Sequence, residues 1–168
     1  MTHSMYPMIT IEEAWQRIAA VVRPLSPLRM PLEQVLGCVL AEDIAADEDM
    51  PPFPSSAMDG YAVIAYDGSP LRRVVGHQDA GPRQPLRVEP RTAVRIMTGG
   101  LLPEGADAVI EVERTRESDG TVELLGSVAS GENVRPAGQD VAAGDTVLER
   151  GQMLGPAEIG LLATVGRI

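Results

Sequence analysis

Apolar residues follow a helical spacing near the start of the chain. Thr10 and Glu13 match a capping box, in which each side chain accepts a hydrogen bond from the other residue's backbone, and Pro24 cannot continue a helix. The apolar positions between them share one helical face: Ile11, Ala14, Trp15, Ile18, Ala19 and Val22. We therefore predict a helix over residues 10–24 whose apolar face, Trp15 included, is buried in the core.

The middle of the chain changes to short apolar runs separated by turn residues, a pattern typical of β-strands. The runs are YAVIA, LRRVVG, LRVE, TAVRIM, DAVIEVE and TVELLG, and Asp119-Gly120 predicts a hairpin turn between the last two. A further strand pair is expected in AGDTVLERGQML, with Gly151 at its turn. Pro156 suits a first helical position and Gly166 a helix end, so a second helix is expected between them.

This order of elements predicts an α+β protein that is mainly β. Helix-bearing segments at both ends can bury their apolar faces by packing together, with the β-rich middle as an insertion. We therefore expect a discontinuous framework domain from residues 1–48 and 138–168, and an inserted β-rich domain from residues 49–137. The 17 glycines and 14 prolines favour short strands over a helical bundle.

The charge of the chain narrows its expected partners. With 14 basic and 24 acidic residues the net charge is −10, and every basic residue is an arginine. Such a chain repels nucleic acid and anionic lipid, so neither is expected as a partner, and an anionic substrate needs a cation, a local arginine or another domain. No apolar run approaches the length of a membrane span.

Cysteine and histidine are too few for several kinds of site. Cys38 stands alone, so the chain cannot form an internal disulfide, which fits a reducing cytoplasm. One cysteine and two histidines exclude a Cys/His metal cage. We expect His3 and His77 to be surface residues.

Three glycine- or proline-rich segments could carry chemistry. SSAMDGYAV places Asp59 at its centre, and ENVRPAGQDVAAGD contains Arg135 and Asp140. In RIMTGG a strand is expected to end at Thr98, and Gly99-Gly100, one of them with φ above zero, can expose N–H groups that cradle an anion. Each segment alone is more often a turn or linker than a site, and PPFPSSAMDG alone is typical of a stiff linker ending in an Asp-Gly turn.

Together and in this order, the segments resemble the N-terminal region of the MoeA family, the molybdopterin molybdotransferases, which includes the E domain of gephyrin. The resemblance is carried by PPFPSSAMDGYAV, RIMTGGLLPEGADAV, NVRPAGQDV and GDTVLERGQMLGPAEIGLLATVG, and it extends from the first helix to Gly166. It implies a fold of coiled, branching β-sheets with flanking helices. It also changes the expectation for the proline-rich stretch. Instead of a linker, we expect a rigid segment that precedes and positions the loop carrying Asp59.

The resemblance further implies an activity. The family inserts molybdate into adenylylated molybdopterin with Mg²⁺ and releases AMP, in cytoplasmic homodimers whose active cleft lies between subunits. By motif, Asp59, Thr98 and Asp140 match positions regarded as important at that cleft. Because Mg²⁺ prefers carboxylate, water and phosphate oxygens, Asp59 and Asp140 are the candidate metal ligands. The Thr98 hydroxyl and the amides of Gly99 and Gly100 are expected to bind an oxyanion.

One departure from the family bears on activity. Family members continue into a domain resembling the molybdopterin adenylyltransferase and then into a small β domain, and this sequence contains neither. We therefore expect a fragment of a molybdopterin molybdotransferase that is inactive alone. The alternative is a non-catalytic dimerisation or scaffold module that has kept the family fold, and the sequence leaves both open.

Overall fold

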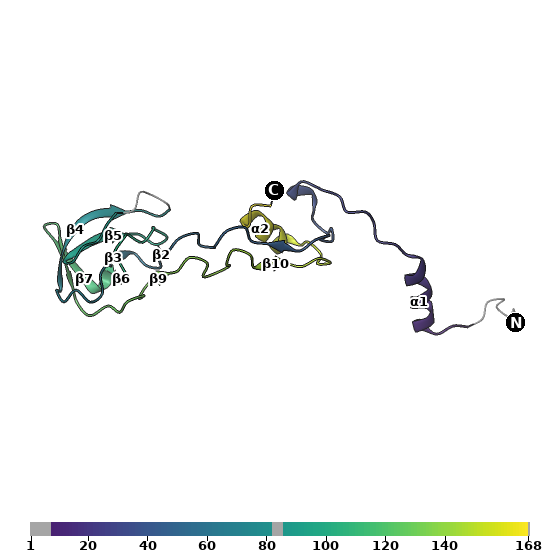
Figure 1. Cartoon of the computed structure of the whole chain (residues 1–168), viewed down its shortest axis with the longest axis horizontal. Coiled ribbons are helices and arrows are strands. Elements are labelled where there is room, and N and C mark those ends of the chain that lie inside the picture. Colours follow the sequence, from purple (N-terminus) through teal and green to yellow (C-terminus); the bar gives the residue numbers. More distant parts are fainter. Residues whose placement is uncertain (1–7, 82–85, 168) are drawn as a thin grey trace.

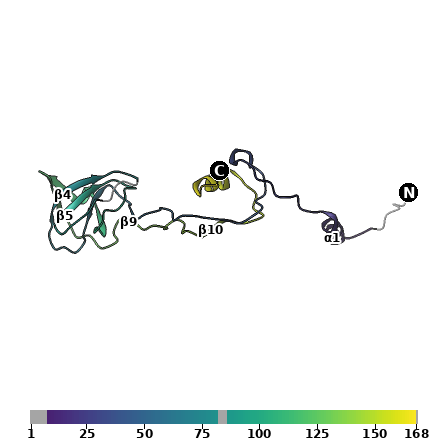
Figure 2. The ribbon, with the colours of Figure 1, turned by 45° about the horizontal axis from the view of Figure 1, so that its top comes forward.

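The computed structural model describes residues 8–81 and 86–167. Within these residues the chain is mainly β, with two α-helices and a curled six-stranded sheet. The sheet lies at one end, a two-stranded ribbon leads from it to the region of α2 (Pro156–Thr164), and α1 (Ile11–Val21) lies at the other end (Figure 1, Figure 2). The predicted fold class, α+β and mainly β, is therefore confirmed.

The six-stranded sheet is built from the middle of the chain, in the order β6-β3-β5-β4-β8-β7. Its strands are β3 (Gly60–Val63), β4 (Leu71–Gln78), β5 (Thr92–Ile96), β6 (Ala108–Glu111), β7 (Thr115–Ser118) and β8 (Thr121–Leu124). Neighbouring strands are antiparallel except β4 and β5, which run parallel. Both of these strands therefore end at the same edge of the sheet, where Gln78 lies opposite Ile96.

Apolar side chains cover both faces of this sheet. Alternate residues of β3 fall into two separate clusters, with Tyr61 and Val63 in one and Ala62 in the other. The first cluster also contains Ala93, Ala108, Ile110, Val122, Leu124 and Val128, and the second contains Val88, Val94, Ile96 and Val109. Burial on both faces explains why YAV, TAV and AVI are continuous apolar runs rather than alternating ones.

The Asp119-Gly120 turn is confirmed, but it connects a different pair of strands from the expected one. Asp119 (φ 50°) and Gly120 (φ 74°) join β7 to β8, with Ser118 opposite Thr121. The DAVIEVE run instead forms β6, and the chain then passes through one turn of 3₁₀ helix, η2 (Val112–Arg114), before β7 begins. The polar sequence of β7, TRES, lacks the apolar signal by which the other strands were predicted.

Short strands from distant parts of the chain pair in a nested order. β2 (Ser55–Ser56) pairs with β9 (Val134–Arg135), and β1 (Ile44–Ala45) pairs with β10 (Thr146–Leu148). Between them Met50 forms an isolated bridge with Val141. The chain thus leaves for the sheet and returns along the same ribbon, as an inserted domain requires. The boundaries near residues 48 and 138 stay predictions.

The prediction of a strand pair within residues 143–154 is wrong. Gly151 (φ 92°) does form a turn, but β10 pairs with β1, and Met153 forms a bridge with Val39. Both partners come from the N-terminal part of the chain. Local turn signals identified the turn correctly, while the pairing was decided by segments about 100 residues away, which sequence patterns do not reveal.

A small apolar core lies where the short 3₁₀ turn η1 (Leu32–Gln34) packs against α2. It contains Ile44, Ala46, Leu148, Leu154, Leu162 and Val165. The helix begins at Pro156, and the backbone N of Gly155 donates a hydrogen bond to Oε2 of Glu158 at 2.9 Å. Gly166 (φ 76°) follows its end, so the predicted second helix is confirmed.

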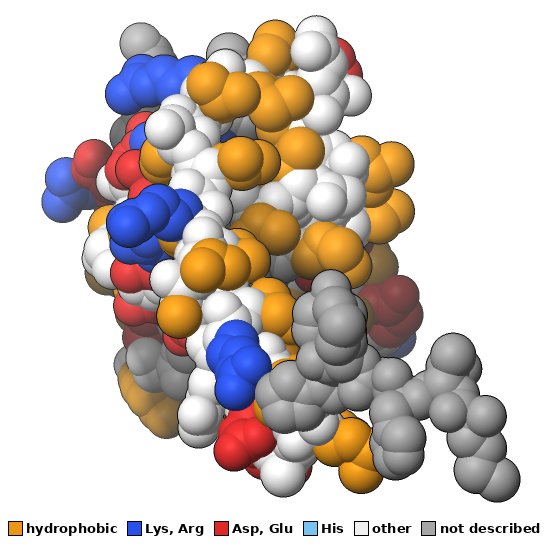
Figure 3. Space-filling model, turned by 90° about the vertical axis from the view of Figure 1, so that its right-hand side faces the viewer, with side chains coloured by type: hydrophobic (Ala, Val, Ile, Leu, Met, Phe, Trp, Pro, Cys, Tyr) orange, Lys and Arg blue, Asp and Glu red, His pale blue; other side chains and the backbone are white. Residues whose placement is uncertain are grey.

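The first helix forms as predicted, but the prediction that its apolar face is buried is wrong. The capping box is present: Thr10 Oγ1 accepts from Glu13 N at 3.1 Å, and Glu13 Oε2 accepts from Thr10 N at 3.2 Å. No residue of α1 is buried, and Trp15 is 67% exposed. Figure 3, which views the molecule from this end, shows exposed hydrophobic side chains. The helical stripe requires a partner, but none lies within the described residues.

Two smaller expectations have different outcomes. His77 is half exposed and lies 2.8 Å from Oδ1 of Asp79, as expected of a surface residue, whereas His3 lies outside the described residues. Among the described helices none is both long and apolar enough to cross a membrane.

Candidate functional site

Asp59 and Thr98 meet where β3 begins and β5 ends. Asp59 directly precedes β3, and Thr98 follows β5 by two residues, while Gly60 lies opposite Ile96 in the antiparallel pair. Oδ1 of Asp59 accepts hydrogen bonds from the backbone N and from Oγ1 of Thr98, both at 2.8 Å. The structure therefore brings together two of the three residues that the sequence nominated as catalytic.

The Asp59 carboxylate is exposed and is held in its charged form. The hydrogen bond from the Thr98 backbone holds the pKa of Asp59 below its usual value of 3.8, and the Thr98 hydroxyl and the charge of Arg95 lower it further. Desolvation acts in the opposite direction but does not outweigh them. Within the described residues Oδ2 of Asp59 accepts no hydrogen bond, so this oxygen is open to a ligand.

Ser56 fixes the segment that carries Asp59, and the sequence analysis did not identify this role. Its Oγ donates to the carbonyl of Met58 at 2.5 Å, and its backbone N donates to the carbonyl of Gly100 at 3.0 Å. Ser56 is fully buried, although serine is usually exposed. The only signal in the sequence was a serine pair that ends three residues before Asp59.

The expectation that Gly99 and Gly100 expose free N–H groups is wrong. Gly99 N donates to the Ser56 carbonyl at 2.8 Å, and Gly100 N donates to the Met97 carbonyl at 2.9 Å. An anion could use either amide only by replacing a backbone hydrogen bond. The expected positive φ is present at Gly99 (79°), and a Cβ on Gly100 would lie 2.9 Å from the Met97 carbonyl oxygen. The glycines are therefore required by the turn, and their part in cofactor binding stays a prediction.

Arg95 is a second residue that the sequence analysis missed at this site. Its Nη1 donates to the Gly60 carbonyl at 3.2 Å, and its guanidinium carbon lies 5.0 Å from the centre of the Tyr61 ring. The Tyr61 hydroxyl in turn donates a hydrogen bond to Glu117. A charged residue within the otherwise apolar run TAVRI was the signal that could have identified it. Its position places a fixed positive charge beside Asp59.

Asp140 lies on the ribbon rather than beside Asp59. Its backbone N donates to the Met50 carbonyl at 2.8 Å, and its Oδ2 accepts from Nη2 of Arg135 at 2.6 Å. Within the described residues no hydrogen bond or ion pair joins Asp140 to Asp59 or Thr98. Arg135 lies opposite Ser55 in the β2–β9 pair, so the ion pair adjoins the strand that leads toward Asp59.

The donor set allows only a limited metal site on this chain. No group of three or more His, Cys, Asp or Glu side chains is placed to hold a metal ion in the part of the chain that the structure describes. Asp59 offers one open oxygen, whereas Asp140 already pairs with a cation. A hard ion at Asp59 would therefore depend on water and on phosphate oxygens for most of its coordination, which is the usual condition of Mg²⁺.

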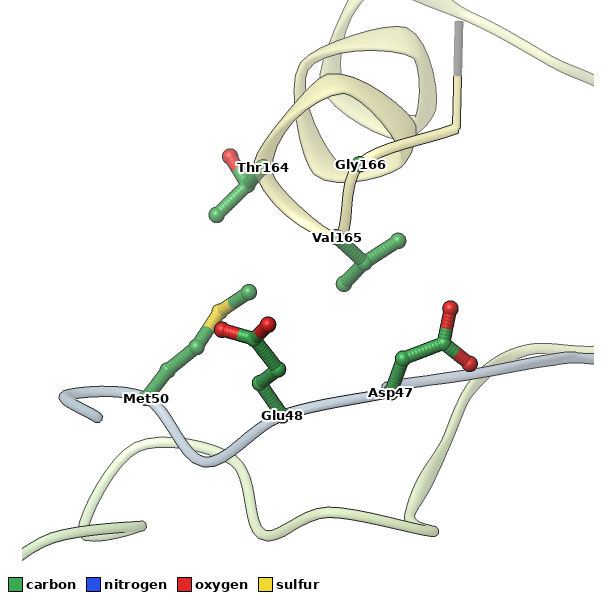
Figure 4. A pocket seen from close by; sticks show the side chains of 6 residues that line it. All are labelled: Asp47, Glu48, Met50, Thr164, Val165 and Gly166. Atoms are coloured by element: carbon green, nitrogen blue, oxygen red, sulfur yellow. The ribbon is translucent and has the colours of Figure 1, made fainter.

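A pocket of about 240 Å³ lies elsewhere, between the end of α2 and residues 47–50. In Figure 4 the carboxylates of Asp47 and Glu48 rise from the chain toward the end of α2. There the pocket is lined by Thr164, the last helical residue, and by Val165 and Gly166, which follow it. Asp47 also accepts a hydrogen bond from Arg167. None of the predicted site residues lines this pocket, so it is not the candidate site.

The chain is similar to curated proteins over most of its length. It is 40% identical over 166 residues to molybdopterin molybdenumtransferase 2 of Mycobacterium tuberculosis H37Rv, a match that covers 95% of this chain and 41% of that protein. It is 36% identical to the molybdopterin molybdenumtransferase of Staphylococcus aureus MSSA476, over 94% of this chain and 39% of that protein. The chain thus spans about two fifths of the length of these relatives.

Solved structures and a family profile give the same result. A molybdopterin biosynthesis MoeA protein from Pyrococcus horikoshii has a TM-score of 0.84 at 30% identity, covering 95% of this chain and 43% of that one. A second structure, from P. horikoshii OT3, has a TM-score of 0.76 at 35% identity, covering 82% and 38%. The profile of the MoeA N-terminal region (domain I and II) matches residues 9–166. The chain therefore belongs to the MoeA N-terminal region family.

Proposed function

We propose that this chain forms the N-terminal part of a molybdopterin molybdotransferase, which inserts molybdate into adenylylated molybdopterin during molybdenum cofactor biosynthesis. The observation that carries the proposal is the exposed Asp59 carboxylate, which two Thr98 donors hold in its charged form. The names of the curated relatives support molybdopterin as the substrate class. Because the chain spans about two fifths of those relatives, it supplies one part of the site and is inactive alone.

The chemistry of Asp59 suits a phosphate-containing substrate if a cation lies between them. When bound, Mg²⁺ offsets the repulsion between this acidic chain and a pyrophosphate group and stabilises charge on the leaving AMP. Asp59 would hold the ion through Oδ2, directly or through water, because Oδ1 is occupied by Thr98. Asp140 is a weaker candidate, since it would first have to leave Arg135. The Thr98 hydroxyl orients the carboxylate through its hydrogen bond to Oδ1.

We further propose that the protein acts as a homodimer in the cytoplasm. The apolar stripe of α1 supports an assembly role, because Ile11, Trp15 and Ile18 lie on one face of a capped amphipathic helix and are more than half exposed. The same observation supports the second candidate function, a non-catalytic dimerisation or scaffold module. The two candidates differ in one testable respect, since only the first requires the charge of Asp59.

A chimera tests the proposal. This chain is joined to the remaining part of the M. tuberculosis relative, and AMP release and molybdenum insertion are measured with adenylylated molybdopterin, molybdate and Mg²⁺. We expect the chimera to be active, Asp59→Asn to abolish insertion, and the chain alone to be inactive. Asp119→Asn is the matched control, because this exposed residue has φ 50° in a hairpin turn, a conformation that asparagine also tolerates.

The outcomes separate the candidates. An active chimera that keeps its activity after Asp59→Asn would show that the site assignment is mistaken. A chimera that folds and dimerises but inserts no molybdenum, with or without substitution, would favour the scaffold function.

A further inference from the structure

The guanidinium of Arg95 is held in a defined position near the start of β3. Arg95 lies on β5 directly opposite Tyr61, and its guanidinium carbon is 5.0 Å from the centre of that buried ring. Its Nη1 donates a hydrogen bond at 3.2 Å to the carbonyl of Gly60, the residue that follows Asp59. The aromatic ring and the carbonyl each restrict the orientation of the guanidinium, so its charge stays close to the Asp59 turn.

The remaining donors of Arg95 are unpaired and can be reached from solvent. Within the described residues only Nη1 of this side chain makes a hydrogen bond, and no carboxylate forms an ion pair with it. The residue is partly exposed, and Nε and Nη2 are not among the buried side-chain atoms that lack a partner. In this respect Arg95 differs from Arg72, whose unpaired Nε and Nη1 are enclosed by protein.

Arg95 and Asp59 carry opposite charges at the same end of the sheet, yet they form no ion pair within the described residues. Each is held by other groups. Thr98 binds Oδ1 of Asp59, while Gly60 and the ring of Tyr61 hold the guanidinium. The charge of Arg95 still acts on the carboxylate and helps to lower its pKa. The site therefore offers an open carboxylate oxygen and, near it, open guanidinium donors.

We propose that Arg95 binds a tetrahedral oxyanion at the Asp59 site. The inference rests on the proposed function for the identity of the anion, which is either a phosphate group of the substrate or molybdate. Nε and Nη2 donate to two of its oxygen atoms, because the planar fork of a guanidinium matches the geometry of such anions. A cation at Oδ2 of Asp59 would offset the repulsion between that carboxylate and the anion. Arg95 thus supplies the local positive charge that an acidic chain needs for an anionic substrate.

Nuclear magnetic resonance titration of the isotope-labelled 168-residue chain tests this inference without an enzymatic assay. The probes are methyl phosphate and molybdate, each added in the presence of Mg²⁺, and sodium chloride of equal ionic strength is the blank. We expect a saturable shift of the Arg95 Nε–H resonance with at least one of the two anions and none with chloride. The relative affinities of methyl phosphate and molybdate identify which anion the site prefers.

Substitutions separate binding at Arg95 from general attraction to arginines. Arg95→Gln should lower the anion affinity at least about tenfold, because it removes a bidentate contact between charged groups. Arg95→Lys keeps the charge but not the fork, so we expect a smaller loss of about threefold. Arg73→Gln is the matched control: this exposed residue lies on β4, about 13 Å along the strand from the residue opposite Arg95, and the change should alter affinity by less than about twofold.

The chimera described above provides a second measurement. Arg95→Gln should raise KM for the substrate that carries the anion at least about tenfold and change kcat much less, because a binding contact rather than a reacting group is lost. Arg73→Gln should change neither constant. A chimera that is inactive in every form would overturn the proposed function, while the titration would still decide the role of Arg95.

Two results would overturn this inference. One is the absence of a saturable shift at Arg95 Nε–H with both anions in the unsubstituted chain. The other is an anion affinity that is the same in the unsubstituted chain and in Arg95→Gln. Circular dichroism shows whether each variant is folded. If Arg95→Gln is not, the unsubstituted chain and Arg95→Lys decide the question.

Discussion

The six-stranded sheet and helix α1 show how differently two well-marked sequence patterns can be used. The strands of the sheet come from short apolar runs. Val63 and Ile110 are fully buried in the cluster on one face of the sheet, and Val94 is fully buried in the cluster on the other face. The helix has a clear apolar stripe and a complete capping box, yet none of its residues is buried. Periodicity establishes that a face is apolar, whereas the partner that covers this face is set by the rest of the chain or by another molecule.

The largest expected effect comes from truncating the same residue type in the two regions. Ile110→Ala removes a fully buried side chain from the sheet and should lower the free energy of unfolding by about 2–5 kcal/mol. Ile18→Ala, on the half-exposed stripe of α1, should change it by less than about 0.5 kcal/mol. Urea unfolding followed by circular dichroism measures both. Equal losses would show that α1 is packed in solution.

The next effect is a loss of stability at high pH that originates in the sheet. Desolvation, together with the hydrogen bond to Glu117, raises the pKa of Tyr61 from 10.0 to about 12. As the pH rises, the Tyr61 hydroxyl loses its proton in the unfolded chain before it does so in the folded chain. Its contribution to the free energy of unfolding is therefore fully present below pH 10 and is lost as the pH rises toward 12, a loss of about 2–3 kcal/mol in total.

The measurement for Tyr61 is the urea midpoint as a function of pH. Tyr61→Phe should remove this part of the alkaline dependence, and Tyr66→Phe, at a 79% exposed position, should retain it. An unchanged alkaline profile in Tyr61→Phe would mean that another group causes the loss.

Local chemistry explains which features could be predicted from the sequence. The Asp119-Gly120 turn, the start of α2 at Pro156 and the capping box at Thr10 depend on neighbouring residues, and all three are present. The pairing of β10 with β1 and the use of the Gly99 amide by the Ser56 carbonyl depend on chain segments that meet only in the fold. At the candidate site Asp59 and Thr98 were predicted, whereas Ser56 and Arg95 support them through long-range contacts that no local pattern indicates.

A smaller effect is expected at the exposed edge of the sheet under acid. The pKa of Asp59 in the folded state lies below its usual value of 3.8. The ionised carboxylate therefore stabilises the fold fully above pH 3.8, and this stabilisation is lost as the pH falls through the lower folded-state pKa. The Thr98 amide resonance should follow this titration because its N–H donates to Asp59. In Asp59→Asn the titration should vanish while the sheet stays folded. A Thr98 amide that titrates identically in the variant would contradict the observed hydrogen bond.

The smallest expected effect concerns Trp15, the single tryptophan of the chain, whose fluorescence therefore reports on α1 alone. Since the residue is 67% exposed, its emission in dilute solution should resemble that of unfolded protein and should be readily quenched by acrylamide. The emission should hardly change while circular dichroism records unfolding of the sheet. If the stripe is the dimer contact, raising the protein concentration should shift the emission to shorter wavelength and protect it from quenching, and Ile11→Asp, also on the stripe, should prevent both changes. A blue-shifted, protected tryptophan at the lowest concentration would instead place α1 against its own chain, and the contrast between helix and sheet would no longer hold.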